Sequence, residues 1–346
     1  MKYNKIENTD LEVSQICLGS MTWGEQNTEE EGHEQLDYAI SQGVNFIDTA
    51  EMYSVPGRVE TQGSTESIIG TWLAKNKNRK EITLATKVTG PNPGLSYIRK
   101  GPNFKRESIE LALEGSLKRL QTDYIDIYQL HWPERKTNFF GKLNYKHDSN
   151  DEWIDNVANI IETMNNAVKR GDIRYYGLSN ETAWGLMHYL RTADELNLDK
   201  CITVQNPYSL LNRSYEVGLA EASVREGVKL LAYSPLAFGV LSGKYLEGGT
   251  PVDGRITLYP QFSRYSNEHT LNAVSEYKKV ADKYHIDLVK MSLAFIIQQP
   301  FVASTIIGAT KMSQLKQNID SINLTLADEI LKDLEAVHEK FPFPAP

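Results

Sequence analysis

Residues 44–53 read Val44-Asn45-Phe46-Ile47-Asp48-Thr49-Ala50-Glu51-Met52-Tyr53, an apolar run that ends in an acid and is followed five residues later by a tyrosine. A short apolar run of this kind is typical of a buried strand. A carboxylate at the end of the strand and a phenol on the loop after it could meet in one polar site. On its own the pattern is weak, because many buried strands end in Asp and many loops carry Tyr.

The order of strand, loop and helix recurs on both sides of this stretch. Residues 1–19 alternate as strands do, with a turn at residues 8–10, and predict an N-terminal hairpin followed by a core strand. Thr28 and Glu31 form a capping-box pattern that begins the first helix, which ends before Gly43. Further strands are predicted at residues 82–88, 124–131, 175–180, 202–206, 229–234 and 304–308, and further helices at residues 64–75, 108–120, 160–169, 183–196, 218–226, 270–284, 289–299, 312–319 and 327–338.

Eight core strands that alternate with helices favour a (β/α)₈ TIM barrel over a doubly wound sheet. We expect one barrel domain over residues 1–346, with an N-terminal β-hairpin and an extra C-terminal helix. Two connections, at residues 132–153 and 236–269, are unusually long. In a barrel such loops lie on the face that carries the chemistry, so we expect lids or ligand clamps there. The aromatic residues of the first loop either pin it down or form a wall around an apolar substrate.

Composition narrows the classes of partner. Lys and Arg number 37 against 45 Asp and Glu, which gives a net charge of -8 without a basic block. This balance argues against nucleic acid or an anionic membrane as the main partner and favours small molecules. Cys17 and Cys201 have no metal-binding or redox spacing, which suggests a reducing compartment. With no apolar leader and no long apolar run, the expected location is the cytoplasm. An oligomer is not required.

Polar residues at the ends of the predicted strands suggest a site. If the barrel forms, Asp48, Lys87 and His131 end three consecutive strands at one face, with Tyr53 on the adjoining loop. A lysine at the end of an apolar strand is costly to desolvate unless it is paired, and Asp48 is its natural partner. The ammonium would then lower the pKa of Tyr53 from about 10 and make the phenol a usable proton donor. His131 would orient a carbonyl oxygen, and no metal is needed.

Eight short blocks resemble the signatures of the aldo-keto reductase superfamily, in the same order and near the predicted strand ends. They are residues 19–23, 48–53, 85–87, 129–132, 177–180, 205–208, 232–236 and 307–310. The resemblance covers nearly the whole chain. Within the superfamily, the long loop after His131 and the run Phe262-Ser263-Arg264-Tyr265 resemble the bacterial Tas-like reductases.

The resemblance implies an NADPH-dependent reductase of aldehydes and ketones, with a small carbonyl compound as its substrate. Tyr53 would be the general acid, Lys87 and Asp48 the pair that tunes it, and His131 the residue that orients the carbonyl. The substrate pocket would be formed by Trp23, Met52, Tyr53, His131 and Trp132.

The same resemblance implies positions for an NADPH or NADP cofactor. Ser179, Asn180 and Gln205 would bind the nicotinamide carboxamide, and Tyr233 would stack on the ring. The pyrophosphate loop would include Ser234, Leu236, Gly239, Leu241 and Lys244, the adenosine end Gly308, Thr310, Gln314, Gln317 and Asn318, and further contacts Gly19, Ser20, Met21, Thr22, Trp23, Asp48, Pro235 and Ile307. Arg264 is the candidate for the 2′-phosphate, with Arg255 and Lys311 as alternatives, because a guanidinium binds phosphate bidentately. The family often has a basic residue near Gln314, and this chain lacks one there.

Two other interpretations remain open. Proteins that resemble potassium-channel β subunits share this pattern, so the chain could be an NADPH-binding regulatory subunit with slow turnover. It could also be an unrelated barrel enzyme in which Lys87 forms a Schiff base. The Asp48 and Tyr53 neighbours and the block at residues 308–310 argue against the Schiff-base enzyme.

Overall fold

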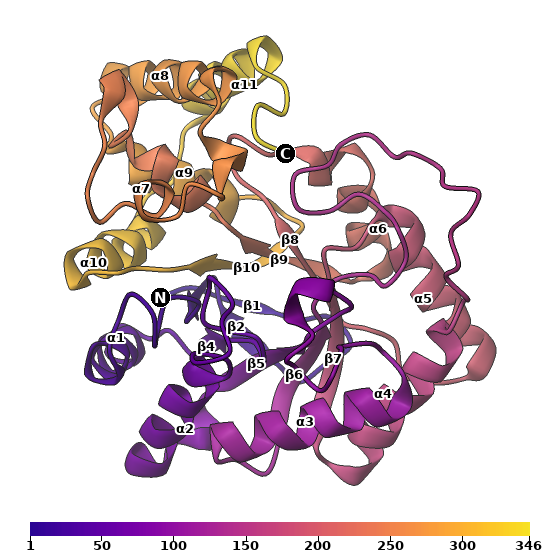
Figure 1. Cartoon of the computed structure of the whole chain (residues 1–346). Helices are drawn as coiled ribbons and strands as arrows, with labels where there is room; N and C mark the ends of the chain where they lie inside the picture. The colour runs from indigo at the N-terminus through magenta and orange to yellow at the C-terminus, as the bar shows by residue number, and fades with distance from the viewer.

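Eight parallel strands close into a barrel in the computed structural model, which describes residues 1–346 (Figure 1). The barrel closes because β10 pairs with both β3 and β9. The predicted (β/α)₈ fold is therefore confirmed. In chain order the strands are β3 (Ile16–Gly19), β4 (Phe46–Asp48), β5 (Thr83–Val88), β6 (Ile125–Leu130), β7 (Ile173–Ser179), β8 (Thr203–Pro207), β9 (Lys229–Tyr233) and β10 (Val302–Ile307).

Helices surround the barrel (Figure 1). The first begins at a capping box, since Thr28 accepts a hydrogen bond from the backbone of Glu31 and the Glu31 carboxylate accepts one from the backbone of Thr28. The helices after successive strands are α1 (Glu29–Ser41), α2 (Ser64–Asn76), α3 (Arg106–Leu120), α4 (Val157–Arg170), α5 (Ala183–Leu196), α6 (Leu219–Glu226), α9 (Leu288–Ile297) and α10 (Met312–Asp320). Two more, α8 (Glu268–Lys283) and α11 (Asp328–Lys340), pack against each other at one side of the ring (Figure 1). None of the helices has the combination of length and apolar character that a membrane-spanning helix requires.

The two long connections differ in structure. The loop after β6 contains no helix or strand until α4 begins. The loop after β9 contains short helical turns, among them η4 (Ala237–Ser242), α7 (Arg255–Leu258) and η6 (Ser263–Tyr265). Both loops begin at the carboxyl ends of their strands, so they lie over the same end of the barrel.

The predicted hairpin forms, but the strand predicted after its turn is interrupted. β1 (Tyr3–Lys5) pairs antiparallel with β2 (Glu12–Ser14), and Gln15 separates β2 from β3. The backbone N–H of Gln15 donates to Lys2 at 2.9 Å, while its carbonyl accepts from Thr305 of β10 at 2.9 Å. Gln15 is therefore the residue at which pairing changes from the hairpin to the barrel, and this change depends on contacts distant in the sequence.

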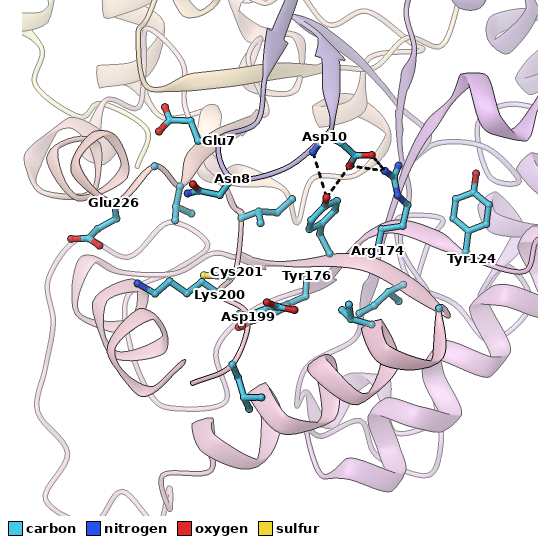
Figure 2. Close-up of a pocket in the computed structure, with 18 of the residues that line it drawn as sticks. Glu7, Asn8, Asp10, Tyr124, Arg174, Tyr176, Asp199, Lys200, Cys201 and Glu226 are labelled. Carbon is cyan, nitrogen blue, oxygen red and sulfur yellow. Dashed lines mark hydrogen bonds and ion pairs between the residues drawn. The ribbon is translucent and has the colours of Figure 1, made fainter. Parts of the chain in front are cut away.

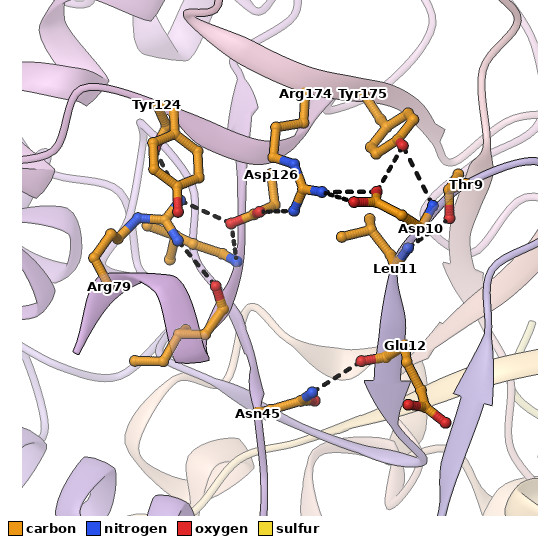
Figure 3. Close-up of polar contacts among 12 residues, drawn as sticks. Thr9, Asp10, Leu11, Glu12, Asn45, Arg79, Tyr124, Asp126, Arg174 and Tyr175 are labelled. Atoms are coloured by element: carbon orange, nitrogen blue, oxygen red, sulfur yellow. Dashed lines mark hydrogen bonds and ion pairs between the residues drawn. The ribbon is translucent and has the colours of Figure 1, made fainter.

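Ion pairs connect the hairpin turn to the amino-terminal ends of the strands (Figure 3). Arg174 of β7 donates to both carboxylate oxygens of Asp10, at 2.7 and 2.6 Å, and Tyr175 donates its hydroxyl to Asp10 at 2.8 Å. Arg174 also donates to Asp126 of β6 at 2.8 Å, and Arg79 donates to the other oxygen of Asp126 at 2.7 Å. Asp126 is buried. The network holds the hairpin against the end of the barrel opposite the βα loops.

Replacing Asp126 with asparagine removes the negative charge between two guanidinium groups. We expect the free energy of unfolding to fall by about 3 kcal/mol, because a broken buried ion pair leaves uncompensated charge. Urea unfolding followed by circular dichroism measures the change. As a control, Asp172→Asn removes the exposed pair with Arg170 and should cost less than about 1 kcal/mol. Equal losses for the two variants would contradict the stabilising role of the buried network.

Candidate active site

A cavity of about 950 Å³ opens at the carboxyl ends of the barrel strands. Asp48, Ser179, Gln205 and Tyr233 line it from four different strands, and the loops after β6 and β9 add further walls. It continues to Asn318 on α10. This is the end of a (β/α)₈ barrel at which side chains from many strands converge and at which the active sites of such barrels lie.

A second cavity, of about 1070 Å³, lies at the opposite end, beside the hairpin turn (Figure 2). Its cations are paired, Arg174 with Asp10 and Lys200 with Asp194, whereas its acidic residues Asp123, Asp199 and Glu226 form no ion pair. Cys201 is buried there, and burial raises the pKa of its thiol to about 12, which keeps it protonated. This second cavity therefore holds no reactive group comparable to those at the strands' carboxyl ends.

A buried ion pair forms the floor of the first cavity. The Lys87 ammonium donates to an Asp48 carboxylate oxygen at 2.6 Å and to the Thr49 carbonyl at 2.6 Å. The other Asp48 oxygen accepts from the side-chain amides of Gln205 at 2.8 Å and Gln129 at 3.3 Å. Burial disfavours the Lys87 charge, but Asp48, Tyr53 and Cys17 together outweigh that effect, and the pKa of Lys87 is raised. Lys87 is therefore a fixed cation.

Tyr53 lies against this cation. The Lys87 nitrogen is 5.0 Å from the centroid of the Tyr53 ring. The Tyr53 backbone is held by hydrogen bonds to the Ala50 carbonyl at 3.0 Å and from the Gly63 N–H at 2.7 Å. The expectation of a lowered pKa for Tyr53 is wrong here, because burial raises the pKa and the Lys87 charge offsets only part of that rise. The phenol is thus protonated throughout the neutral range.

His131 completes the group. Its ring packs edge-on to Tyr53, with centroids 5.7 Å apart, and against Trp132 at 4.7 Å. Burial, and then repulsion from Lys87, lowers the pKa of His131 well below its usual value, so the imidazole is neutral. Its buried Nδ1 atom has no hydrogen-bond partner in the protein. That atom is shielded from solvent, but the residue lines the cavity, so the rest of the ring is available to a ligand.

Hydrogen bonds fix the polar residues beside His131. Asn180 donates its amide to the His131 carbonyl at 2.8 Å and accepts from the Tyr233 hydroxyl at 2.6 Å. Ser179 donates to the Gln205 carbonyl at 2.8 Å. The backbone of Asn180 is left-handed, with φ of 57°, a conformation that asparagine tolerates. These contacts join the ends of β7, β8 and β9 into one rigid polar rim.

The charged residues around the rest of the cavity are unbalanced. Both acidic side chains that line it are paired, Asp48 with Lys87 and Asp253 with Lys311, the latter at 2.5 Å, and the terminal carboxylate of Pro346 also lies in its wall. Lys244, Arg255 and Arg264 also line it, and none of them forms an ion pair with a carboxylate. In a chain of net charge -8, this cavity therefore carries excess positive charge suited to anionic ligand groups.

Most of the residues expected to bind cofactor or substrate line this cavity. Two expected contacts do not, because Trp23 and Leu241 are buried in the hydrophobic core. The Trp23 ring packs directly against Gly32 of α1, where a larger residue would collide with it, and its indole N–H donates a hydrogen bond to Gln35 at 3.3 Å. Lys87 is also fully buried and acts from behind the cavity wall. The expected residues that line the cavity are Gly19, Ser20, Met21, Thr22, Asp48, Met52, Tyr53, His131, Trp132, Ser179, Asn180, Gln205, Tyr233, Ser234, Pro235, Leu236, Gly239, Lys244, Arg264, Ile307, Gly308, Thr310, Gln314, Gln317 and Asn318.

Several contributors were not expected from the sequence. The Gln129 amide donates a hydrogen bond to Asp48. The sequence could have indicated this position, because residues two apart on a strand point to the same face and His131 is two positions after Gln129. Leu95, Phe140 and Gly141 form part of the wall. The aromatic residues of the loop after β6 suggested such a wall, but its Tyr145 is 61% exposed and lies outside it.

Comparison with known proteins gives a consistent pattern. A model described as "Aldo/keto reductase family" matches residues 15–339. Protein tas of Escherichia coli (strain K12) is 51% identical to this chain over the full length of both. The uncharacterized oxidoreductase YrpG of Bacillus subtilis is 33% identical, over 100% of this chain and 97% of that protein. A probable voltage-gated potassium channel subunit beta of Oryza sativa is 30% identical, over 99% of this chain and 98% of that protein.

Two glycines of the cavity provide a matched test of its packing. A methyl group at Gly19 would lie 2.8 Å from the Ile306 side chain and 3.1 Å from the Ile307 carbonyl, whereas one at Gly308 would meet nothing within 4 Å. We expect Gly19→Ala to lower the free energy of unfolding by about 1–3 kcal/mol through overpacking. Gly308→Ala should stay within about 0.5 kcal/mol of the parent protein. Thermal unfolding of both variants measures this, and a stable Gly19→Ala protein would contradict the close contact of β3 with β10.

Proposed function

Because the chain belongs to the aldo/keto reductase family, we propose that it reduces aldehydes and ketones to alcohols with NADPH as the hydride donor. The family and its oxidoreductase relatives make the chain an oxidoreductase, and the family generally uses NADH or NADPH. The observation that carries the more specific proposal is the contact of Tyr53 with the buried Lys87 and with the neutral ring of His131. A protonated phenol, a fixed cation and a neutral hydrogen-bonding ring suit protonation of an oxygen that is becoming negative.

The cavity fits a nicotinamide dinucleotide. It is long, it has an amide-rich rim, and its unpaired cations match the phosphates of such a ligand. Ser179, Asn180 and Gln205 would hold the carboxamide, and Tyr233 would support the ring. Gln314 and Asn318 would face the adenosine; they already brace the loop after β10 through hydrogen bonds to the Thr310 N–H at 3.0 Å and the Gly308 carbonyl at 3.2 Å.

Arg255 is our candidate for the 2′-phosphate, with Lys244 for the neighbouring phosphates. Burial lowers the pKa of Lys244, the Asp253 carboxylate opposes this, and the Arg255 and Lys311 cations lower the pKa further, so these charged groups are neighbours in the cavity. Lys311 is the N-cap residue of α10, the helix that carries Gln314. Arg264, the first candidate from the sequence, instead contacts Tyr265. We therefore assign the phosphates to Lys244 and Arg255.

The chemistry of this chain's residues follows from their charges. When bound, the reduced nicotinamide supplies a hydride to the carbonyl carbon. His131 donates a hydrogen bond that positions the carbonyl oxygen, and Tyr53 transfers its phenolic proton to that oxygen. The Lys87 cation stabilises the phenolate that this leaves, and Asp48 holds the ammonium in place. The phenolate then regains a proton from water.

The comparison with potassium-channel β subunits supports a regulatory role less well. Those relatives are 30% identical to the chain, against 51% for Protein tas. Reductase activity is therefore the function that we propose.

Tyr53→Phe tests the proposal directly. The variant keeps the ring but loses the proton, so we expect kcat for aldehyde reduction to fall by about 10²–10⁴-fold. NADPH affinity, measured by quenching of protein fluorescence, should stay nearly unchanged. The control is Tyr97→Phe, which removes the hydroxyl of a tyrosine packed beside Leu95 and Trp132 and should retain parent activity. A Tyr53→Phe enzyme with most of its activity would exclude the general-acid role.

The pH dependence of reduction gives a second test. Tyr53 donates only when protonated, and its pKa lies above the ordinary 10.0, so this contribution is lost only as the pH rises through that higher value. His131 stays neutral down to well below pH 6.5. We therefore expect kcat to be flat from about pH 6.5 to about 9.5 and to decline only in more alkaline solution. A decline between pH 7 and 9 in single-turnover rates would show that the pKa of Tyr53 is lowered instead.

A further inference from the structure

A buried ion pair joins two of the loops that surround the proposed site. Arg135 lies in the loop after β6, shortly beyond His131, and Glu181 follows Asn180 just after β7 ends. The Arg135 guanidinium donates one hydrogen bond to each oxygen of the Glu181 carboxylate, at 2.8 and 2.5 Å. The two side chains are only 11% and 4% exposed. The pair therefore has the bidentate geometry that fixes direction as well as distance.

The start of α5 encloses this pair. The Thr182 N–H donates to the Glu181 carboxylate at 2.9 Å, and Arg135 donates to the Thr182 hydroxyl at 3.1 Å. The guanidinium carbon of Arg135 lies 4.9 Å from the centroid of the Trp184 ring. A Cβ atom at Gly185 would collide with both the Glu181 carboxylate and the Arg135 guanidinium. The first turn of α5 thus leaves room for the ion pair and for nothing more.

The backbone of Glu181 is also fixed. The side chain of Asn206, near the end of β8, accepts from the Glu181 N–H at 3.0 Å and donates to the Glu181 carbonyl at 2.8 Å. Both residues are buried. Glu181 is therefore a rigid extension of the polar rim, and Arg135 attaches the loop after β6 to it.

The ion pair closes a ring of contacts that includes His131. Asn180 donates its side-chain amide to the His131 carbonyl at 2.8 Å. The chain runs from His131 through Trp132 to Arg135, the ion pair leads to Glu181, and Glu181 is covalently joined to Asn180. Beyond the paired strands β6 and β7, side-chain contacts thus hold these two segments together at both His131 and Arg135.

We propose that Arg135 is a positioning residue for carbonyl reduction: through Glu181 it holds the His131 ring and the adjoining Trp132 in a fixed place relative to the rim. The inference rests on the reductase function proposed above. A buried ion pair is weak evidence for a contribution to stability, so its geometry is the more informative property. Displacement of a reacting group by about 1 Å can lower a rate by about a hundredfold.

Replacing Arg135 with glutamine removes the charge and the bidentate contact. We expect kcat for reduction of 4-nitrobenzaldehyde to fall by about tenfold to a hundredfold, while KM for the aldehyde and Kd for NADPH change by less than about threefold. Cofactor affinity should persist because Asn180 keeps its hydrogen bonds to Gln205 and Tyr233. Arg135→Lys restores the charge without the forked geometry and should recover part of kcat.

The next residue in the loop provides a matched control. Lys136 is exposed and pairs with Asp148 of the same loop at 2.7 Å, so Lys136→Gln should keep kcat within about twofold of the parent enzyme. Circular dichroism at the assay temperature shows whether each variant is folded. If Arg135→Gln does not fold, Gly185→Ala displaces the pair without removing a charge and should lower kcat in the same way.

A double-mutant cycle with His131 distinguishes positioning from a general loss of structure. If Arg135 acts through His131, Arg135→Gln should lower the single-turnover rate of the His131→Ala enzyme by less than about twofold. A general loss of structure would lower the rate by the same factor in both backgrounds. Equal factors in the two backgrounds, or a parent-like kcat in Arg135→Gln, would overturn the proposal.

A spectroscopic measurement keeps this inference separate from the reductase proposal. In the free protein with ¹⁵N-labelled histidine, the ring resonance of His131 is assigned by its loss in His131→Ala. That resonance should shift in Arg135→Gln and stay in place in Lys136→Gln. If no aldehyde is reduced but the resonance shifts, the reductase function fails and the positioning role stands. If aldehydes are reduced and Arg135→Gln changes neither kcat nor the resonance, the positioning role fails and the reductase stands.

Discussion

The buried ion pair between Asp48 and Lys87 is the interaction on which the rest of the site depends. An ammonium without a partner at this depth would destabilise the fold by several kcal/mol. The Asp48 carboxylate lies between Lys87 on one side and the amides of Gln129 and Gln205 on the other. These four side chains come from β5, β4, β6 and β8, so one polar cluster links half of the barrel strands across the interior. Tyr53 contacts this cluster through Lys87, and His131 packs on Tyr53.

The cavity divides into parts with separate origins. Strand ends supply the Lys87 cation, its Asp48 partner and the rigid amide rim, the loop after β4 supplies Tyr53, and the closed barrel fixes the positions of the strand ends. The long loops supply the apolar wall and the unpaired cations. The loop after β6 contributes Phe140 and Gly141, and the loop after β9 contributes Lys244, Arg255 and Arg264. The proposed chemistry thus depends mainly on the rigid scaffold and the proposed ligand choice on the long loops, as in many barrels.

The sequence predicted the elements well because their signals are local. Apolar runs and the Thr28 capping box identified the barrel, and with it the meeting of Asp48, Lys87, His131 and Tyr53. The predictions failed where contacts between residues distant in the sequence determine the structure. Gln15 changes pairing partners because of Thr305, and Trp23 lies in the core because Gly32 leaves space for it. The pKa of Tyr53 is raised because burial exceeds the effect of Lys87, a balance that no motif encodes. Likewise, Arg255 and Arg264 both lie in the loop after β9, and their different neighbours in the cavity are known only from the folded loop.

The network of Asp10, Arg174, Asp126 and Arg79 lies at the end of the barrel farthest from the proposed chemistry. The residues that anchor the hairpin to the barrel and the residues that line the cavity are therefore different residues of the same strands. Substitutions in the loops above the cavity do not touch these ion pairs, and substitutions that strengthen the ion pairs do not touch the cavity. A scaffold arranged in this way can acquire new specificities without first giving up its resistance to unfolding.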